Sequence, residues 1–242
     1  MRRIVFTALA ICLVNLVFAQ ADTTVRKRPV LNRETRTSND HILIQLGHTT
    51  WTNKPDTIST KGWSRSFAAY LMMDFPFKTN PHWSVALGPG VSTENVFFDK
   101  MYVGIKDNTT SLNFVDVSDT THYKKYKLAI TFLELPVELR FRFNPDDDRR
   151  SVKIAIGAKI GTLVNAHTKG KNLQNKNGNA LADYIVKENS KRFFNKNRLS
   201  VMGRIGFGHF SVYGSYAITP LFREGLGPDV KPLTIGLTLS GL

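Results

Sequence analysis

The chain has 242 residues, a formal net charge of +14, 42% hydrophobic residues and one cysteine. This length is sufficient for one all-β domain, and a single cysteine excludes a disulfide framework. The excess of positive charge is typical of proteins whose partners are anionic.

The first twenty residues have the pattern of a cleaved secretory signal peptide. Arg2 and Arg3 precede an apolar stretch at residues 4–17, and small residues follow it at a potential cleavage site. The apolar stretch is shorter than a comfortable membrane-spanning helix, so we expect cleavage rather than anchoring. Cys12 would be lost with the signal. Residues 21–39 are basic and aperiodic, which predicts a flexible periplasmic segment before a barrel domain at residues 40–242.

Alternation of apolar and polar residues with a period of two predicts eight strands in the remaining chain. The expected strands lie at about residues 42–51, 64–77, 83–91, 125–143, 152–164, 198–208, 210–219 and 233–240. Short and long connections alternate, as they do between the two ends of an outer-membrane barrel. We expect long external loops at residues 95–123 and 167–192, with a short helix at 180–187. Pro89 predicts a bulge or a kink in its strand.

The clearest alternation is at residues 152–164, where apolar residues occupy one face and small or cationic residues the other. In the preceding strand the apolar set begins at Leu133, but it has the opposite phase above that residue. This reversal predicts either a β-bulge near Phe132 and Leu133, or an upper half that stands clear of the membrane. Only helices and closed barrels can span lipid, and in barrels the apolar faces contact the lipid. The pattern therefore predicts an all-β, eight-stranded, antiparallel up-and-down transmembrane β-barrel, located in the outer membrane.

In such a barrel the charged faces of the strands meet in the interior. The residues expected there are Glu134, Glu138, Arg140, Arg142, Lys153, Lys159 and Arg204. Eight strands enclose a space that side chains can fill, so we expect a salt-bridge network and not an open pore. Two alternatives remain. One is a narrow channel, and the other is a soluble lipocalin-like carrier with the charges outside and an apolar ligand cavity inside, because a period of two cannot distinguish the two faces.

The sequence contains no metalloprotease motif, phosphate-binding loop or nucleophile elbow, and its six histidines are scattered. We therefore expect no enzymatic activity, no metal and no cofactor. The expected partners are outer-membrane lipid, lipopolysaccharide and envelope or secretion proteins, and export argues against nucleic acid. The candidate partner-binding loop contains Lys169, Lys171, Lys176, Lys191 and Arg192.

Residues 132–141 read FLELPVELRF, which resembles the aromatic-Leu-Glu-Ile-Pro-x-x-x-(Lys/Arg) signature of PorT-like outer-membrane β-barrel proteins. Phe132 stands at the usual Tyr position and Leu135 at the usual Ile position. The glycines at 88 and 90, and those at 157 and 161, fit the resemblance too. It implies an eight-stranded outer-membrane barrel. Because some members of that family assist type IX protein secretion and gliding, it also implies an accessory role in secretion.

Overall fold

The computed structural model describes residues 41–61, 63–145 and 150–241. The predicted signal peptide, residues 1–20, and the predicted periplasmic segment, residues 21–39, lie outside these ranges. The described strands belong to one unit, Thr35–Leu242. The described ranges contain no α-helix, and hence no helix that could cross a membrane.

The described ranges form thirteen strands. They are β1 (Ile42–Thr52), β2 (Arg65–Leu71), β3 (Met73–Pro76), β4 (Trp83–Leu87), β5 (Gly90–Phe98), β6 (Met101–Val103), β7 (Phe114–Asp116), β8 (His122–Arg142), β9 (Val152–Gln174), β10 (Ala180–Asn189), β11 (Asn197–Phe207), β12 (Phe210–Ala217) and β13 (Lys231–Ser240).

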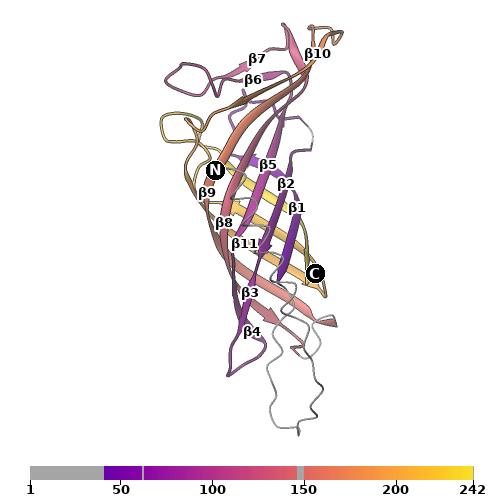
Figure 1. Cartoon of the computed structure of the whole chain (residues 1–242), viewed down its shortest axis with the longest axis vertical. Coiled ribbons are helices and arrows are strands. Elements are labelled where there is room, and N and C mark those ends of the chain that lie inside the picture. Colours follow the sequence, from indigo (N-terminus) through magenta and orange to yellow (C-terminus); the bar gives the residue numbers. More distant parts are fainter. Residues whose placement is uncertain (1–40, 62, 146–149, 242) are drawn as a thin grey trace, which may run out of the picture. The chain divides into compact units, whose positions relative to one another are not determined.

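Eight of these strands pair in chain order and close into a ring. β1, β2, β5, β8, β9, β11, β12 and β13 each pair antiparallel with the next, and β13 pairs with β1. The predicted eight-stranded antiparallel fold is therefore confirmed. β6, β7 and β10 lie at one end of the ring, called the upper end here, and β3 and β4 lie at the other (Figure 1).

Two pairs of strands continue one another along the ring. β2 and β3 form one line, and so do β4 and β5, because their registers with the neighbouring strands do not shift. The interruption between β4 and β5 falls at Gly88 and Pro89, since proline has no N–H for the ladder. The Pro89 carbonyl still accepts a hydrogen bond from the Leu71 N–H at 2.9 Å. The irregularity predicted at Pro89 is thus a break without an extra residue.

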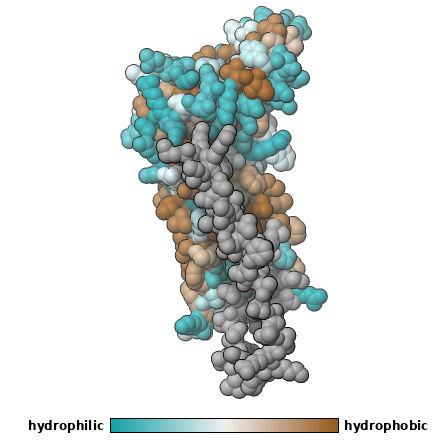
Figure 2. Space-filling view, in the orientation of Figure 1, coloured by the Kyte–Doolittle hydropathy of each residue, from teal (hydrophilic) through white to brown (hydrophobic). Residues whose placement is uncertain are grey.

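The outward faces of the ring form an apolar belt, and the inward faces are largely polar. Figure 2 shows hydrophobic residues below a hydrophilic upper end. Exposed belt residues include Leu46, Phe67, Leu71, Leu133, Leu135, Val137, Ile156, Ile160, Val201, Ile205, Val212, Ile235 and Leu237. Buried inward residues include Gln45, Asp74, Ser84, Glu134, Lys159, Ser200, Ser211 and Thr238. This is the inverse of a soluble carrier and contradicts the lipocalin-like alternative.

On β8 the directions of the side chains differ from the sequence-based prediction. Its even-numbered residues face inward without interruption from Tyr126 to Arg142. The expected bulge near Phe132 and Leu133 is therefore absent from this strand. A register shift does occur beside Thr131 and Phe132, but the extra residue, Val164, is on β9. What changes at Phe132 is the interior itself, which is charged below this residue and apolar above it.

The apolar upper interior is a cluster that we call the cap core. The connections between strands contribute Ile58, Leu112, Phe193, Phe194, Leu221, Phe222 and Val230, and the strands contribute Trp51, Val96, Phe98, Tyr126, Leu128, Ile130 and Phe132. Phe222 makes edge-to-face contact with Trp51, at 5.9 Å between ring centroids. The loops thus fold over the mouth of the ring and bury their aromatic residues in it.

Two predicted loops contain more strand than expected. β5 extends to Phe98, and the β6–β7 hairpin occupies part of the segment 95–123. In the segment 167–192, β9 continues to Gln174 and β10 pairs back onto it. The helix predicted at 180–187 is wrong. These residues form β10 because pairing with the protruding end of β9 satisfies the backbone.

Candidate functional site

The upper part of the interior charge network is centred on Arg198. Its guanidinium lies 2.5 Å from Glu94 Oε1 and 2.5 Å from Glu134 Oε1, and it donates to Ser92 Oγ at 3.3 Å. The same guanidinium stacks over the Phe132 ring at 3.9 Å from its centroid. Arg198 therefore joins the charged layer to the cap core above it.

Glu134 is shared by three strands besides its own. In addition to Arg198, its carboxylate accepts a hydrogen bond from the Tyr70 hydroxyl at 2.6 Å and lies 3.4 Å from Lys159 Nζ. Buried carboxylates need such compensation, because an unpaired charge in a medium of low dielectric constant is costly. Glu134 connects β2, β8, β9 and β11 in one cluster.

A second cluster, nearer the lower end, is centred on Glu138. Arg140 Nε lies 2.8 Å and Arg204 Nη2 3.0 Å from Glu138 Oε2. Arg140 also lies 3.5 Å from Asp74, and Arg142 lies 3.7 Å from the same carboxylate. The charges of β3, β8 and β11 therefore form one chain of contacts.

Small residues on β9 make these contacts geometrically available. Gly161 stands between Glu134 on one side and Arg198 on the other in a single row of the sheet. With no side chain on Gly161, Arg198 reaches across β9. Gly157 lies against the neighbouring backbone, where an added Cβ would be 2.2 Å from the Val137 carbonyl oxygen. The glycines of β9 thus leave room for the larger charged side chains of β8 and β11.

All the interior residues proposed from the sequence are buried in the ring: Glu134, Glu138, Arg140, Arg142, Lys153, Lys159 and Arg204. Two further residues of the network, Arg198 and Glu94, were not predicted from the sequence. Arg198 is the second residue of its strand and Glu94 the fifth of β5, close to an expected loop. Tyr70 and Asp74 also belong to the network, through Glu134 and Arg140, and nothing in the alternation predicts these contacts.

The network is enclosed. Glu134 and Glu138 are 2% and 1% exposed, and the cap core covers the interior from above. Within the described residues, no group of three or more His, Cys, Asp or Glu side chains is arranged to hold a metal ion. The ion-paired network joins the strands of the ring, and its carboxylates have little access to solvent.

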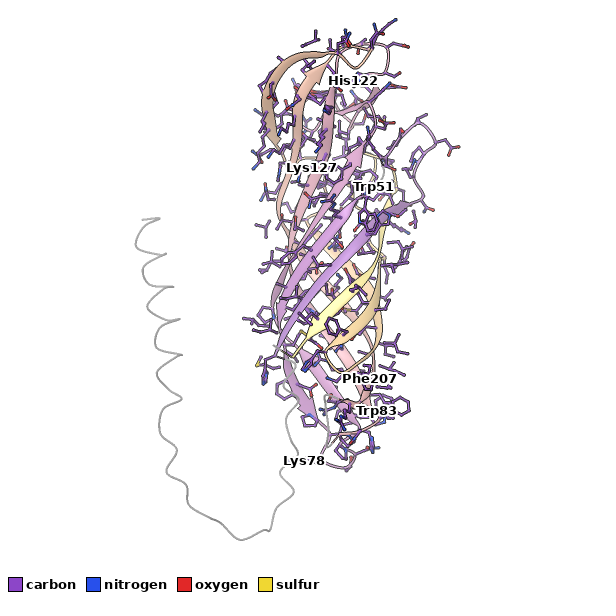
Figure 3. All side chains as sticks on the ribbon, turned by 90° about the vertical axis from the view of Figure 1, so that its right-hand side faces the viewer. Trp51, Lys78, Trp83, His122, Lys127 and Phe207 are labelled. Carbon is purple, nitrogen blue, oxygen red and sulfur yellow. The ribbon has the colours of Figure 1, made fainter. Side chains whose placement is uncertain are left out.

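The second candidate surface is basic and lies outside the ring, on the outward face of the extension formed by β8, β9 and β10. Lys127 stands directly opposite Lys169, and Lys169 directly opposite Lys187. We call these three residues the lysine row. In the next row up, Lys125 stands opposite Lys171. Lys127 and His122 are labelled near the upper end in Figure 3, and Trp83 and Phe207 mark the lower end of the belt.

The residues of the predicted partner-binding loop do not form one loop. Lys169 and Lys171 are on β9, Lys176 is in the turn between β9 and β10, and Lys191 and Arg192 follow β10. The structure brings Lys169 beside lysines of two other strands and Lys171 opposite Lys125, whereas Lys176, Lys191 and Arg192 lie outside these rows. Sequence alone could not find this row, because it requires the pairing registers of β8, β9 and β10.

The edge of β10 is a third feature of the upper end. Among the described strands, β10 pairs with β9 alone. Leu181, Tyr184 and Ile185 on this strand are 53%, 43% and 55% exposed. An exposed edge strand with apolar side chains offers backbone hydrogen-bonding groups to another chain.

A depression of about 730 Å³ lies on the outward face of the belt, on the same two strands that carry Lys127 and Lys169. Its apolar lining includes Leu133 and Leu135 of β8, Ile160 of β9 and Leu199 of β11. Thr162, Asn197 and Thr219 contribute polar atoms. Glu134 and Arg198 of the interior network also line the depression, on its inner side.

Comparison with known proteins gives one family. The family described as outer membrane protein beta-barrel domain matches residues 30–223, which is most of the chain. No curated protein sequence matches.

Proposed function

This chain belongs to the outer membrane protein β-barrel family, and on that premise we propose that it is a non-catalytic accessory protein, which acts through its external extension. The observation that carries the proposal is the filled interior. Ion-paired side chains occupy the lower interior, and the cap core occupies the upper interior. A barrel closed in this way has its accessible features at the upper end.

The external feature best suited to a partner protein is the edge of β10. β-strand addition uses backbone hydrogen bonds for affinity and neighbouring side-chain contacts for specificity. We infer that an extended segment of an envelope protein pairs with this edge, with apolar side chains near Leu181 and Ile185. The surrounding lysines favour acidic residues in that segment.

The specific process that we propose is protein secretion, and it rests on the resemblance of residues 132–141 to the PorT-like signature. In the structure, Glu134 and Glu138 of this signature are the acceptors of the interior network. The signature therefore relates directly to the interior of the barrel, and only indirectly to protein secretion. The support for secretion is the resemblance alone, so the process needs its own test.

The first experiment separates the accessory role from the channel alternative. Full-length purified protein in a planar lipid bilayer is expected to give no stable conductance steps across a range of voltages. Reproducible single-channel steps would contradict the filled-interior argument and favour the narrow channel. An Arg198→Ala variant, which opens the network, serves as the comparison for residual leakage.

The second experiment tests the edge of β10. In cells that lack the protein, the wild type and a Leu181→Glu/Ile185→Glu variant are compared for the set of secreted proteins. We expect that the variant does not restore secretion. It should still reach the membrane and show the change in gel mobility on boiling that is typical of a folded barrel. Lys78→Gln, at the lower end of the ring in Figure 3, is the control. Normal secretion by the edge variant, or in cells without any copy, would contradict this part of the proposal.

A further inference from the structure

The lysine row is electrostatically unusual. Lys127, Lys169 and Lys187 occupy directly opposed positions on three adjacent strands. Like charges that face each other across strands destabilise a sheet. In the next row down, Arg65 stands opposite Asn95, so a fourth cation lies near one end of the row. An anion bound at the row would relieve this repulsion.

The described protein does not supply that charge. No ion pair among the described residues involves Arg65 or a member of the lysine row. Lys127 Nζ donates to the neutral Asn95 Oδ1 at 2.6 Å and lies 5.9 Å from the centroid of the Phe97 ring. Partial burial, and after it the charges of Lys169 and Arg65, lower the pKa of Lys127. The surface thus carries uncompensated positive charge.

The position of the row points to the kind of anion. Below Lys127, the outward face of β8 passes through Thr131 to the apolar residues Leu133 and Leu135. The depression of about 730 Å³ begins at those leucines. A cationic row above and an apolar hollow below, on the same strands, match a molecule with an anionic head and hydrocarbon chains.

We propose that Arg65 and the lysine row bind the phosphate groups of an outer-leaflet glycolipid of the lipopolysaccharide class, whose acyl chains cover the depression. Lysine ammonium groups act as point charges for phosphate, and the Arg65 guanidinium can bind it in a bidentate manner. The inference rests on the outer-membrane location and on an external upper end, and it does not require that another chain pairs with the β10 edge.

The test uses full-length protein in detergent, with native mass spectrometry and titration to measure lipid binding. The probes are bisphosphorylated lipid A, the same lipid A after dephosphorylation, and inorganic phosphate. We expect wild-type protein to retain the bisphosphorylated lipid, to bind the dephosphorylated form at least about tenfold more weakly, and to show no comparable affinity for inorganic phosphate. Equal binding of the two lipids would overturn the phosphate assignment. Inorganic phosphate that binds as tightly as the lipid would overturn the choice of a lipid.

A matched pair of triple variants locates the site. Lys127→Gln/Lys169→Gln/Lys187→Gln is expected to weaken binding of the phosphorylated lipid about tenfold or more. Lys78→Gln/Lys100→Gln/Lys106→Gln removes the same charge from exposed positions outside the row and is expected to leave binding within about twofold of wild type. An equal loss in both variants would show a general charge effect and overturn the site.

Folding is controlled within the same experiment. Relief of like-charge repulsion predicts that the row variant, free of lipid, melts no earlier than wild type. Lower thermal stability of this variant would show that the lysines serve the fold, and would contradict the proposal. A row variant that loses an acidic partner protein but keeps the lipid would also contradict it. Channel activity would contradict the accessory function without affecting the measured lipid binding. A failure of the proposed function is therefore distinguishable from a failure of the lipid site.

Discussion

Arg198 Nη2 lies 2.5 Å from Glu134 Oε1, although the strands of these two residues, β11 and β8, are not neighbours in the ring. The intervening strand, β9, has Gly161 in the same row. This ion pair therefore requires that the strand between its partners carries no side chain at the position where it crosses.

Loss of Arg198 should be among the most destabilising single changes in the barrel. Arg198→Met leaves the buried carboxylates of Glu94 and Glu134 with reduced compensation, which costs about 3–5 kcal/mol of unfolding free energy. The exposed Lys61, which pairs with Asp99 at 3.5 Å, is the control, and Lys61→Met should cost less than about 1 kcal/mol. Urea unfolding of both variants in detergent measures the difference. Equal effects would show that the buried contact contributes no more than a surface pair.

A side chain at position 161 should disturb the same contact from the other side. An added Cβ would stand 3.0 Å from Glu134 Cγ, so Gly161→Val forces the carboxylate to move and should cost about 1–3 kcal/mol. Gly214 on β12 faces outward with no atom within 4 Å of an added Cβ, so Gly214→Ala should be close to neutral. The thermal midpoint of each variant checks this. A tolerated valine at 161 would mean that Arg198 reaches Glu134 by another path.

The cap core can be tested with a matched pair of leucines. Leu221 is 2% exposed in the cap core, whereas Leu181 on β10 is 53% exposed. Leu221→Ala should cost about 2–5 kcal/mol, and Leu181→Ala less than about 0.5 kcal/mol. Tryptophan fluorescence during urea unfolding reports the change, because Trp51 belongs to the same cluster. Similar costs for both would argue that the loops are not packed into the mouth of the ring.

His167 reports the charge of the lysine row. Partial burial, and then the charges of Lys187, Lys127 and Lys169, lower the pKa of this imidazole below its usual value of about 6.5. Its Nδ1 lies 3.1 Å from Asn165 Nδ2, which suits a neutral ring that accepts a hydrogen bond. The group therefore favours the folded state above the usual pKa, and this stability is lost as the pH falls below it.

Two changes should move the pKa of His167 in the same direction. Lys169→Gln removes a neighbouring positive charge and should raise it, and a bound phosphorylated lipid should raise it too. Chemical shifts of labelled histidine, followed against pH, give the value in each case. A pKa that stays constant when Lys169 is replaced would contradict the electrostatic description of the row.

The alternation of the sequence predicted the ring well because lipid and interior impose opposite chemistry on the two faces of each strand. In β9, for example, Ile156 and Ile160 face outward, and Lys153 and Lys159 face inward. The same logic failed on β8 above Phe132. There the interior is apolar, so the inward-facing residues of β8 are apolar as well. The apolar residues therefore move from odd to even positions in the sequence, although the direction of the side chains does not change.

Register was the information that the sequence lacked. Arg198 and Glu94 meet only when β5, β8, β9 and β11 are aligned, and the lysine row exists only when three strands are in register. β10 was mistaken for a helix because its two faces are both largely exposed, so it has little apolar alternation to reveal a strand. Its strand conformation comes from pairing with β9, which is a tertiary effect.

The junction of β1 with β13 has a consequence for biogenesis. It joins the first and last strands of the ring, and its inward contacts are neutral: Gln45 Nε2 donates to Thr238 Oγ1 at 3.3 Å across 193 residues, and the Thr49 and Thr234 hydroxyls lie 2.9 Å apart. Contacts so distant in the chain form slowly, because loop closure must precede them. The hairpins built from neighbouring strands can therefore assemble first. The pairing of β1 with β13 then closes the ring. Because the inward side chains at this junction are neutral, this last step does not require the dehydration of ions.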